Sequence, residues 1–113
     1  MAVHESYLVF VLDQLGGAGE VVSKKMFGGA GIYLEGFMVG LIYQNSLYLR
    51  GGSANMERFK QANCPQFIPE AKTKSIKMPY WQVPEEVMED KEELREWALE
   101  ALAAAREAKL RVG

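Results

Sequence analysis

The most informative stretch of the sequence is KKMFGGAGIYL, at residues 24–34. A lysine pair and an aromatic residue lead into three glycines within four positions, and strand-forming residues follow. Glycine costs conformational entropy unless the backbone needs its freedom or must pass close to another segment. The cluster therefore predicts a tight turn or bulge at the start of a strand, where helix and sheet backbones approach each other. An anion-binding nest is the alternative, but phosphate loops place such glycines before a helix rather than before a strand.

Strand patterns continue on both sides of the glycines. Residues 20–26 predict a first strand, residues 31–34 and 37–43 predict a hairpin turned by Glu35-Gly36, and residues 46–50 predict a fourth strand. The short turns make each pairing antiparallel. Alternation places Ile32 and Leu34 on one face of the sheet and Tyr33 on the other. In the third strand, alternation places Val39, Leu41 and Tyr43 on one face. It places Met38, Gly40 and Ile42 on the opposite face.

Helical periodicity frames the strands. Apolar spacing predicts a helix over 5–15 and a final helix over 91–109, which starts at Asp90 with Glu93 in a capping box. Between them, Ser53 is expected to cap a helix over 54–62, residues 75–83 are expected to be extended, and Pro84 opens a short helix. We therefore expect an α+β fold, a two-layer antiparallel meander sheet of about five strands with helices packed on one face. The order is α-β-β-β-β-α-β-α(α), in one domain over residues 1–113.

Composition narrows the function classes. The net charge of the 113 residues is −2: residues 1–78 hold eight Lys or Arg against six Asp or Glu, and residues 79–113 hold five against nine. Proteins that bind nucleic acid through phosphates are normally more basic, so any such binding is expected to be weak and local. No apolar run approaches the roughly 20 residues of a membrane span, and no signal-peptide pattern opens the chain. A single cysteine, Cys64, fits a reducing compartment, which predicts a cytoplasmic protein.

Residue types that carry chemistry are sparse. His4 is the only histidine, so no histidine cluster or triad can form. Cys64 is expected to be a small buried hydrophobe rather than a nucleophile, because no nearby histidine activates it. The acids between Glu85 and Glu93 suit helix starts better than a metal site. We predict no catalytic residues, no cofactor and no metal, and a non-enzymatic function; a small-pocket enzyme or ligand-binding protein is the alternative.

One candidate surface combines basic and aromatic residues. If residues 24–29 and 77–81 are neighbours in the sheet, lysines lie beside aromatic rings, which suits a protein partner or, more weakly, a nucleic acid. The alternative is a solvated lysine-rich edge that prevents aggregation. Alternation sends Tyr80 and Trp81 to opposite faces, and Pro79 leaves an unpaired edge that is a template for a partner strand or a homodimer. The predicted partner-binding residues are Lys24, Lys25, Phe27, Gly28, Gly29, Lys77, Tyr80 and Trp81.

Five stretches together resemble the N-terminal domain of the TfoX (Sxy) family, named for regulators of natural competence. They are residues 25–33 (KMFGGAGIY), 47–50 (LYLR), 64–67 (CPQF), 78–85 (MPYWQVPE) and 96–98 (EWA). The resemblance covers nearly the whole chain in order and implies the two-layer α+β fold. Regulatory members pair this domain with a C-terminal helical domain and are thought to help a cyclic-AMP receptor protein act at particular promoters. The resemblance implies a binding module. We therefore expect an accessory in transcription regulation that acts through contact with a protein partner, such as a transcription regulator.

Overall fold

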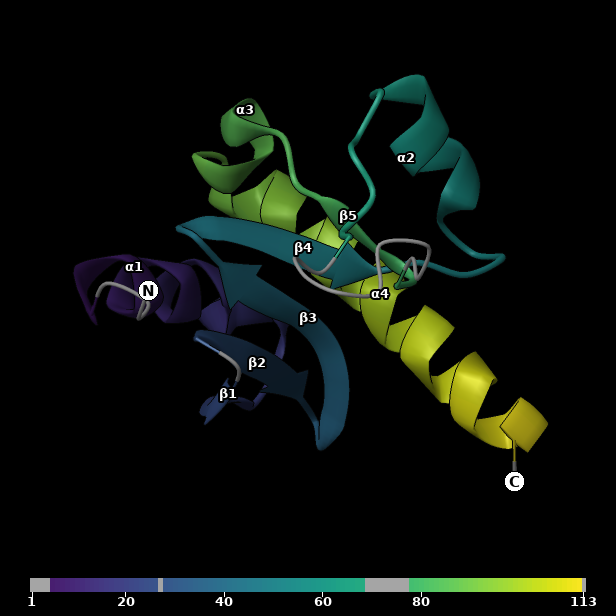
Figure 1. The fold of residues 1–113 in the computed structure, drawn as a ribbon, viewed down its shortest axis with the longest axis horizontal. Helices are drawn as coiled ribbons and strands as arrows, with labels where there is room; N and C mark the ends of the chain where they lie inside the picture. The colour runs from purple at the N-terminus through teal and green to yellow at the C-terminus, as the bar shows by residue number, and fades with distance from the viewer. Residues whose placement is uncertain (1–4, 27, 69–77, 113) are drawn as a thin grey trace.

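The computed structural model describes residues 5–26, 28–68 and 78–112. The chain begins with α1 (Glu5–Leu15) and the short 3-10 helix η1 (Gly16–Ala18). Four strands follow: β1 (Val21–Met26), β2 (Gly29–Leu34), β3 (Phe37–Tyr43) and β4 (Ser46–Arg50). Then come α2 (Met56–Gln61), β5 (Tyr80–Gln82), α3 (Glu85–Met88) and α4 (Lys91–Val112). Figure 1 shows the sheet with α1 and the long α4 against it, so the predicted α+β fold and element order are confirmed.

The sheet is an antiparallel meander in which each strand pairs with the next, in the order β1-β2-β3-β4-β5. Glu35 and Gly36 have positive φ values of 52° and 85°, as a tight hairpin turn with the twist of the strands needs, and the predicted turn is confirmed. Gln44 and Asn45 turn the chain between β3 and β4 in the same way, at φ 51° and 59°. β2 starts two residues earlier than predicted, because Gly29 already pairs with β1.

A bulge in β3 changes which residues face the helices. The register between β2 and β3 shifts after Ile32 and leaves Val39 as an extra residue on β3. Val39 and Ile42 therefore both enter the core on the helix side, whereas Leu41 lies in a second apolar cluster on the opposite face. The predicted division of β3 fails across the bulge: Val39, Leu41 and Tyr43 do not share a face, and neither do Met38, Gly40 and Ile42.

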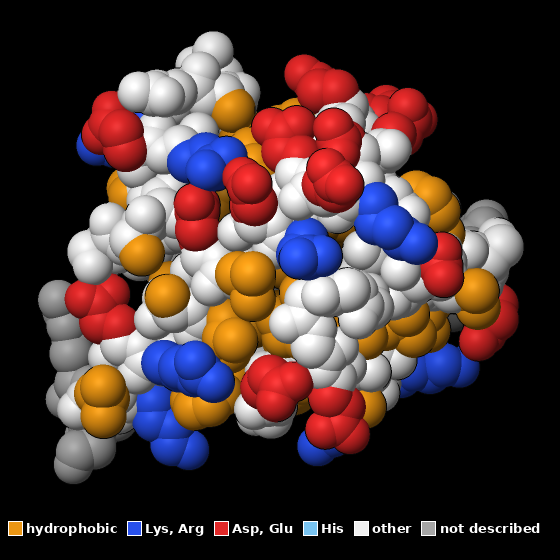
Figure 2. Space-filling view, turned by 180° about the vertical axis from the view of Figure 1, so that it is seen from behind, with side chains coloured by type: hydrophobic (Ala, Val, Ile, Leu, Met, Phe, Trp, Pro, Cys, Tyr) orange, Lys and Arg blue, Asp and Glu red, His pale blue; other side chains and the backbone are white. Residues whose placement is uncertain are grey.

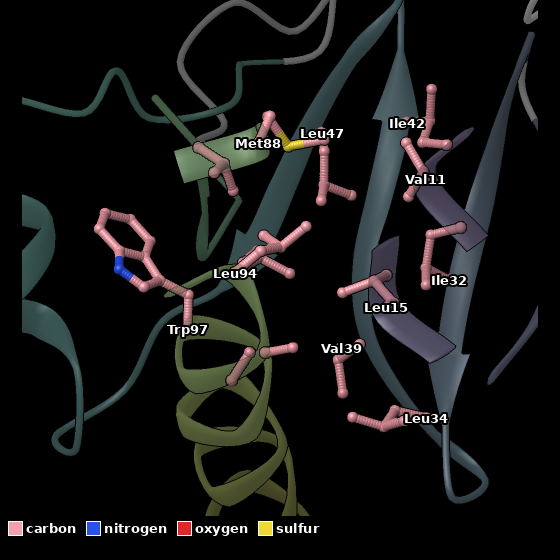
Figure 3. Packing of buried hydrophobic residues seen from close by; sticks show 14 of the residues in the cluster. Val11, Leu15, Ile32, Leu34, Val39, Ile42, Leu47, Met88, Leu94 and Trp97 are labelled. Carbon is pink, nitrogen blue, oxygen red and sulfur yellow. The ribbon is translucent and has the colours of Figure 1, made fainter. Parts of the chain in front are cut away.

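The main core lies between the sheet and the layer formed by α1 and α4. Ile32 and Leu34 both enter it, as alternation predicts, and Leu94 and Trp97 enter it from α4. Burying one Leu or Ile side chain contributes about 1.5–3 kcal/mol, so this layer holds the helices on one face of the sheet. Figure 3 shows the packing and labels Val11, Leu15, Ile32, Leu34, Val39, Ile42, Leu47, Met88, Leu94 and Trp97.

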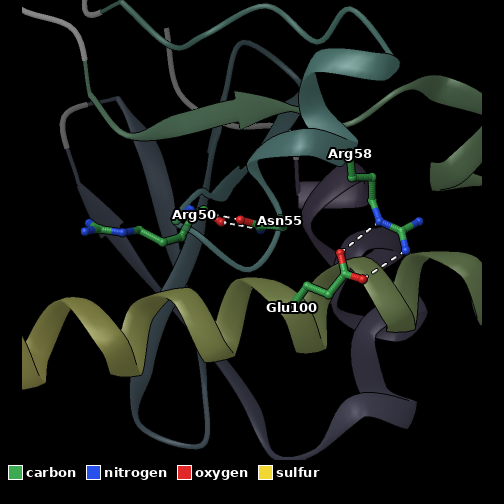
Figure 4. A network of polar contacts seen from close by, with 5 residues as sticks. Arg50, Asn55, Arg58 and Glu100 are labelled. Carbon is green, nitrogen blue, oxygen red and sulfur yellow. Dashed lines mark hydrogen bonds and ion pairs between the residues drawn. The ribbon is translucent and has the colours of Figure 1, made fainter.

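Asn55 closes the loop between β4 and α2. Its side chain is 3% exposed. Its Nδ2 donates to the carbonyl of Arg50 at 2.9 Å, and its Oδ1 accepts from the N–H of Gly52 at 2.8 Å (Figure 4). Asn55 also occupies the N-cap position of α2, whereas the hydroxyl of Ser53 donates to Glu107 at 2.8 Å. The predicted Ser53 cap is therefore wrong, because this hydroxyl ties the loop to α4 instead.

Aromatic stacking and an ion pair hold α2 against the rest of the molecule. The ring of Phe59 stacks on Trp81 with centroids 5.4 Å apart and meets Trp97 edge-on at 5.8 Å. Arg58 Nε lies 2.8 Å from Glu100 Oε1 on α4, and its guanidinium lies 5.3 Å from the centre of the Trp97 ring. α2 thus extends the main core beyond the end of the sheet.

The ends of the last two helices lie close to their predicted positions. Asp90 Oδ1 accepts from the N–H of Glu93 at 3.1 Å, which confirms the predicted start of the final helix. Pro84 precedes α3 as its N-cap residue instead of being its first residue, and α4 continues to Val112 rather than ending at 109. No helix in the described part of the chain has both the length and the apolar composition needed to cross a membrane.

Candidate functional site

The sheet order separates the two segments of the predicted partner surface. Lys24 and Lys25 belong to β1, and Tyr80 and Trp81 belong to β5, at the two ends of the sheet. The prediction that these segments meet at one edge is therefore wrong, because a meander places its first and last strands farthest apart. Phe27 and Lys77 were included in the same surface by sequence, and both lie outside the described residues.

The outer side of β5 is paired rather than open. The N–H of Gln82 donates to the carbonyl of Pro65 at 2.8 Å, and the N–H of Phe67 donates to the carbonyl of Tyr80 at 2.8 Å. The segment that follows α2 thus returns along β5 and binds its outward groups. The predicted unpaired edge at Pro79 is wrong for this reason.

Tyr80 and Trp81 point to opposite faces, as alternation predicts, and both are covered. Tyr80 is 5% exposed and lies in the second apolar cluster with Leu41 and Phe67, on the face away from α1 and α4. Trp81 is half-buried and stacks on Phe59 of α2. Both rings therefore serve the packing of the sheet, and neither stands free as an anchor for a partner.

The two predicted glycines have different roles. Gly28 has φ 78° and turns the chain between β1 and β2. Gly29 is buried in β2, where a Cβ atom would collide with the carbonyl oxygen of Ile42 on β3. The close approach that the sequence predicts is confirmed, but the neighbour is a strand instead of a helix. Because Gly29 pairs with Met26 in the sheet, its backbone is part of a ladder and not of an anion-binding loop.

Four side chains gather around Gly31 on the sheet face away from α1 and α4. A Cβ atom at Gly31 would lie 2.9 Å from Met26 Cε and 3.3 Å from both Met38 Cε and Tyr33 Cε1. Lys24 Nζ lies 5.1 Å from the centre of the Tyr33 ring. Lys24 is exposed, and the other three side chains are partly exposed. We call Lys24, Met26, Tyr33 and Met38 the outer patch, with Gly31 as its floor.

Sequence reasoning found Lys24 but missed the rest of the outer patch. The register of three strands assembles it, since Lys24 lies opposite Gly31 and Tyr33 lies opposite Met38. Alternation placed Tyr33 on the face opposite Ile32, and this was the only sequence pattern that pointed to a member of the outer patch besides Lys24. The pattern within a single strand carries no information on its cross-strand neighbours.

Burial raises the pKa values of three described side chains that could act as nucleophiles. Burial, and secondarily the carboxylate of Glu86, raises the pKa of the Cys64 thiol above its ordinary value of 9.0. A protonated thiol is a poor nucleophile. Burial also raises the pKa of Tyr7 and of Tyr48 above 10.0. Within residues 5–26, 28–68 and 78–112, no three His, Cys, Asp or Glu side chains gather in a way that could hold a metal ion.

Described residues form the walls of a larger and a smaller hollow. The larger, of about 540 Å³, lies between the loop after β4 and α4, where Arg50, Ser53 and Glu107 contribute to its wall. The smaller, of about 190 Å³, is lined by Tyr7 and Glu85 among others. Among their described lining residues, neither hollow combines a nucleophile with a histidine or lysine base, and Ser53 binds Glu107 within the fold. The described walls of these two hollows therefore hold no nucleophile paired with a histidine or lysine base.

Acidic side chains gather where α3 meets α4. Glu85 and Glu86 lie in the first turn of α3, and Glu92 and Glu93 lie in the first turn of α4. Figure 2, which views the molecule from behind, shows several Asp and Glu side chains close together on one part of this surface. Carboxylates in the first turn of a helix interact favourably with its dipole, which accounts for the acids as helix-starting residues.

Comparison with known proteins identifies the family. The model of the TfoX N-terminal domain matches residues 13–105, which include all strands of the sheet and the outer patch. The chain is 34% identical over 67 residues to "DNA transformation protein TfoX1" of Aliivibrio fischeri, a match that covers 59% of this chain and 32% of that protein. It is 32% identical over 90 residues to "Uncharacterized 12.7 kDa protein in trpE 5'region" of Spirochaeta aurantia, covering 80% and 72% of the two chains.

The chain thus spans about a third of the length of the first relative and most of the length of the second. The glycine-rich stretch at residues 24–34 and the MPYWQVPE stretch at residues 78–85 both lie within the region that the family model matches. The family suggested by these stretches is therefore confirmed, and the chain belongs to the TfoX N-terminal domain family.

Proposed function

We propose that the chain is a non-enzymatic protein-binding domain that acts as an accessory in competence-related transcription regulation and contacts its protein partner through the outer patch. The family supports the biological setting, since one relative carries the name of a DNA transformation protein. The observation that carries the contact is the convergence of Met26, Tyr33 and Met38 around Gly31. The absence of a nucleophile beside a histidine or lysine base among the described lining residues of the two hollows supports the non-enzymatic part.

The chemistry of the outer patch suits a particular kind of contact. Methionine side chains adapt to different shapes, and a tyrosine ring supplies a large contact area at low entropic cost. Because Gly31 has no side chain, the ends of Met26, Tyr33 and Met38 meet above it and form one apolar surface that an apolar side chain of the partner would contact. Lys24, exposed beside the Tyr33 ring, favours an acidic residue next to that apolar side chain.

The test compares two matched substitutions in affinity purification from the native host. Tyr33→Glu places a charge in the outer patch, and Leu99→Glu places the same charge at a 43% exposed position on α4. We expect a protein that co-purifies with the unchanged chain and with Leu99→Glu to be lost from Tyr33→Glu, with circular dichroism showing both variants folded. Equal recovery with both variants would contradict the proposal.

Nucleic-acid binding is the second candidate function, and the Lys24–Tyr33 pair favours it, because single-strand binders combine cations with exposed aromatic rings. Binding through phosphates weakens steeply with salt. We expect no saturable binding of a random-sequence duplex or single strand at about 150 mM salt, near physiological ionic strength. Saturable binding that weakens steeply between about 50 and 200 mM salt would instead favour this second candidate.

A further inference from the structure

The two edges of the sheet differ in the described part of the molecule. The outer side of β5 is bound by the segment 65–67, as described above. β1 is the other edge, and the backbone groups of Val21–Met26 that face away from β2 have no hydrogen-bond partner among the described residues. An unpaired strand edge is a template for another strand.

Hydrogen bonding to β2 fixes which groups of β1 face outward. The N–H of Glu35 donates to the carbonyl of Glu20 at 2.9 Å, and the β1–β2 register then runs without a bulge. Backbone groups of residues 20, 22 and 24 therefore face β2, and those of Val21, Ser23 and Lys25 face the open edge. If two copies of β1 pair antiparallel, the outward-facing, odd-numbered residues of one copy form hydrogen bonds with the odd-numbered residues of the other. A two-fold axis between the copies must therefore pass through a residue and not between two residues.

The charges of β1 select one position for such an axis. An axis at Lys24 would set Lys24 against itself, and an axis at Ser23 would set Lys24 against a valine. An axis at Val22 sets Lys24 against a glutamate at both ends of the contact, and it sets Val22, which is 48% exposed, against its own copy. Glu20 and Lys24 are both exposed, and neither has an ion pair among the described residues.

We propose that the chain forms a two-fold dimer in which β1 pairs antiparallel with β1 of a second copy, with Val22 on the axis and Lys24 facing Glu20 of the partner subunit. Opposite charges across neighbouring strands stabilise a pairing, and like charges oppose it. Lysines on an edge strand discourage the addition of an unrelated strand. In the proposed dimer, however, Lys24 faces an oppositely charged residue of the second copy. A two-fold axis perpendicular to the sheet would leave both outer patches on the same face of the dimer. The dimer does not depend on the proposed function.

A charge-swap experiment on the full chain tests this register by sedimentation equilibrium. Glu20→Lys and Lys24→Glu each replace two attractive pairs with two repulsive ones, so we expect each to raise the dimer dissociation constant about tenfold or more. The double variant should restore wild-type association. An equimolar mixture of the two single variants should form a heterodimer, because both of its pairs are again attractive.

Lys25→Glu is the matched control, since it makes the same charge change on the same strand but lies opposite Gly19 in the proposed register. It should change the dissociation constant by less than Lys24→Glu does, and circular dichroism should show every variant folded. A dissociation constant of about 1 mM corresponds to an association free energy of only about 4 kcal/mol. A wild-type chain that remains monomeric at that concentration would overturn the proposal. So would a double variant that associates no better than the single variants, or a Lys25→Glu effect equal to that of Lys24→Glu.

Discussion

At the scale of single residues, Asn55 is a buried polar side chain that closes the loop before α2. Both ends of its buried amide are bound to backbone groups of the loop that leads into α2. We expect Asn55→Ala to lower the free energy of unfolding by about 1–3 kcal/mol, because it leaves buried backbone groups without partners. Urea denaturation measures this change, with the exposed Gln61→Ala on α2 as a control that should stay within about 0.5 kcal/mol. An Asn55→Ala protein as stable as the control would show that water replaces the amide.

Burial raises the pKa of Cys64, and this shift makes the stability of the fold depend on pH in a known direction. The folded chain holds the thiol proton more tightly than the unfolded chain, so the contribution is full below the ordinary pKa of 9.0 and is lost as pH rises through the folded pKa. The raised pKa values of Tyr7 and Tyr48 extend the loss above 10.0. We expect stability to fall on the alkaline side, and Cys64→Ala to remove the earlier part of that slope. A pH profile that is unchanged by Cys64→Ala would contradict this assignment.

The same thiol gives a direct check on the non-enzymatic interpretation. A protonated and partly buried Cys64 should react with a thiol reagent at neutral pH more slowly than free cysteine does. The unfolded chain in denaturant, where Cys64 is fully exposed, is the control for intrinsic reactivity. Labelling much faster than that of free cysteine would indicate an activated nucleophile and favour an enzyme.

At the scale of elements, the contact between β2 and β3 depends on glycine. A Cβ atom at Gly29 would collide with the Ile42 carbonyl, whereas Gly16 has no atom within 4 Å of such a position and no positive φ. We expect Gly29→Ala to destabilise the fold by about 1–3 kcal/mol through strand displacement, and Gly16→Ala to be neutral or slightly stabilising. Thermal unfolding of the two variants measures the difference. Equal melting temperatures would show that the strands separate without cost.

The elements themselves were predictable from local patterns. The helix over residues 5–15 and the Glu35-Gly36 turn follow from periodicity and turn chemistry within a few neighbouring residues. The β3 bulge at Val39 was not predictable, because it depends on how β2 lies beside β3. Ser53 was assigned the cap of α2 because its residue type favours that position, but a distant residue, Glu107, binds its hydroxyl.

The candidate site was less predictable than the fold for the same reason. Lys24 and Trp81 belong to segments whose composition suggested one surface, and the order of the strands put them at opposite ends of the sheet. The outer patch forms instead from three neighbouring strands, which bring Met26, Tyr33 and Met38 together around Gly31. The place of β5 in the sheet and the register between β2 and β3 depend on residues far apart in the sequence, so they require the folded structure.

At the scale of the whole molecule, the sheet has one face covered by α1 and α4 and another on which the outer patch is partly exposed. The net charge of −2 gives no general attraction to phosphate, so a specific contact has to come from a local arrangement of side chains. This combination supports our proposal that this member of the TfoX N-terminal domain family binds a protein partner through the outer patch.

Site-specific photo-crosslinking in the native host tests that claim most directly. A benzophenone amino acid replaces Tyr33 in one variant and Leu99, exposed on α4, in the other. Because a crosslink forms only where a partner touches the probe, we expect one protein adduct from position 33 that is absent from position 99 and insensitive to nuclease. Adducts of equal yield from both positions, or an adduct from position 33 that nuclease removes, would contradict it.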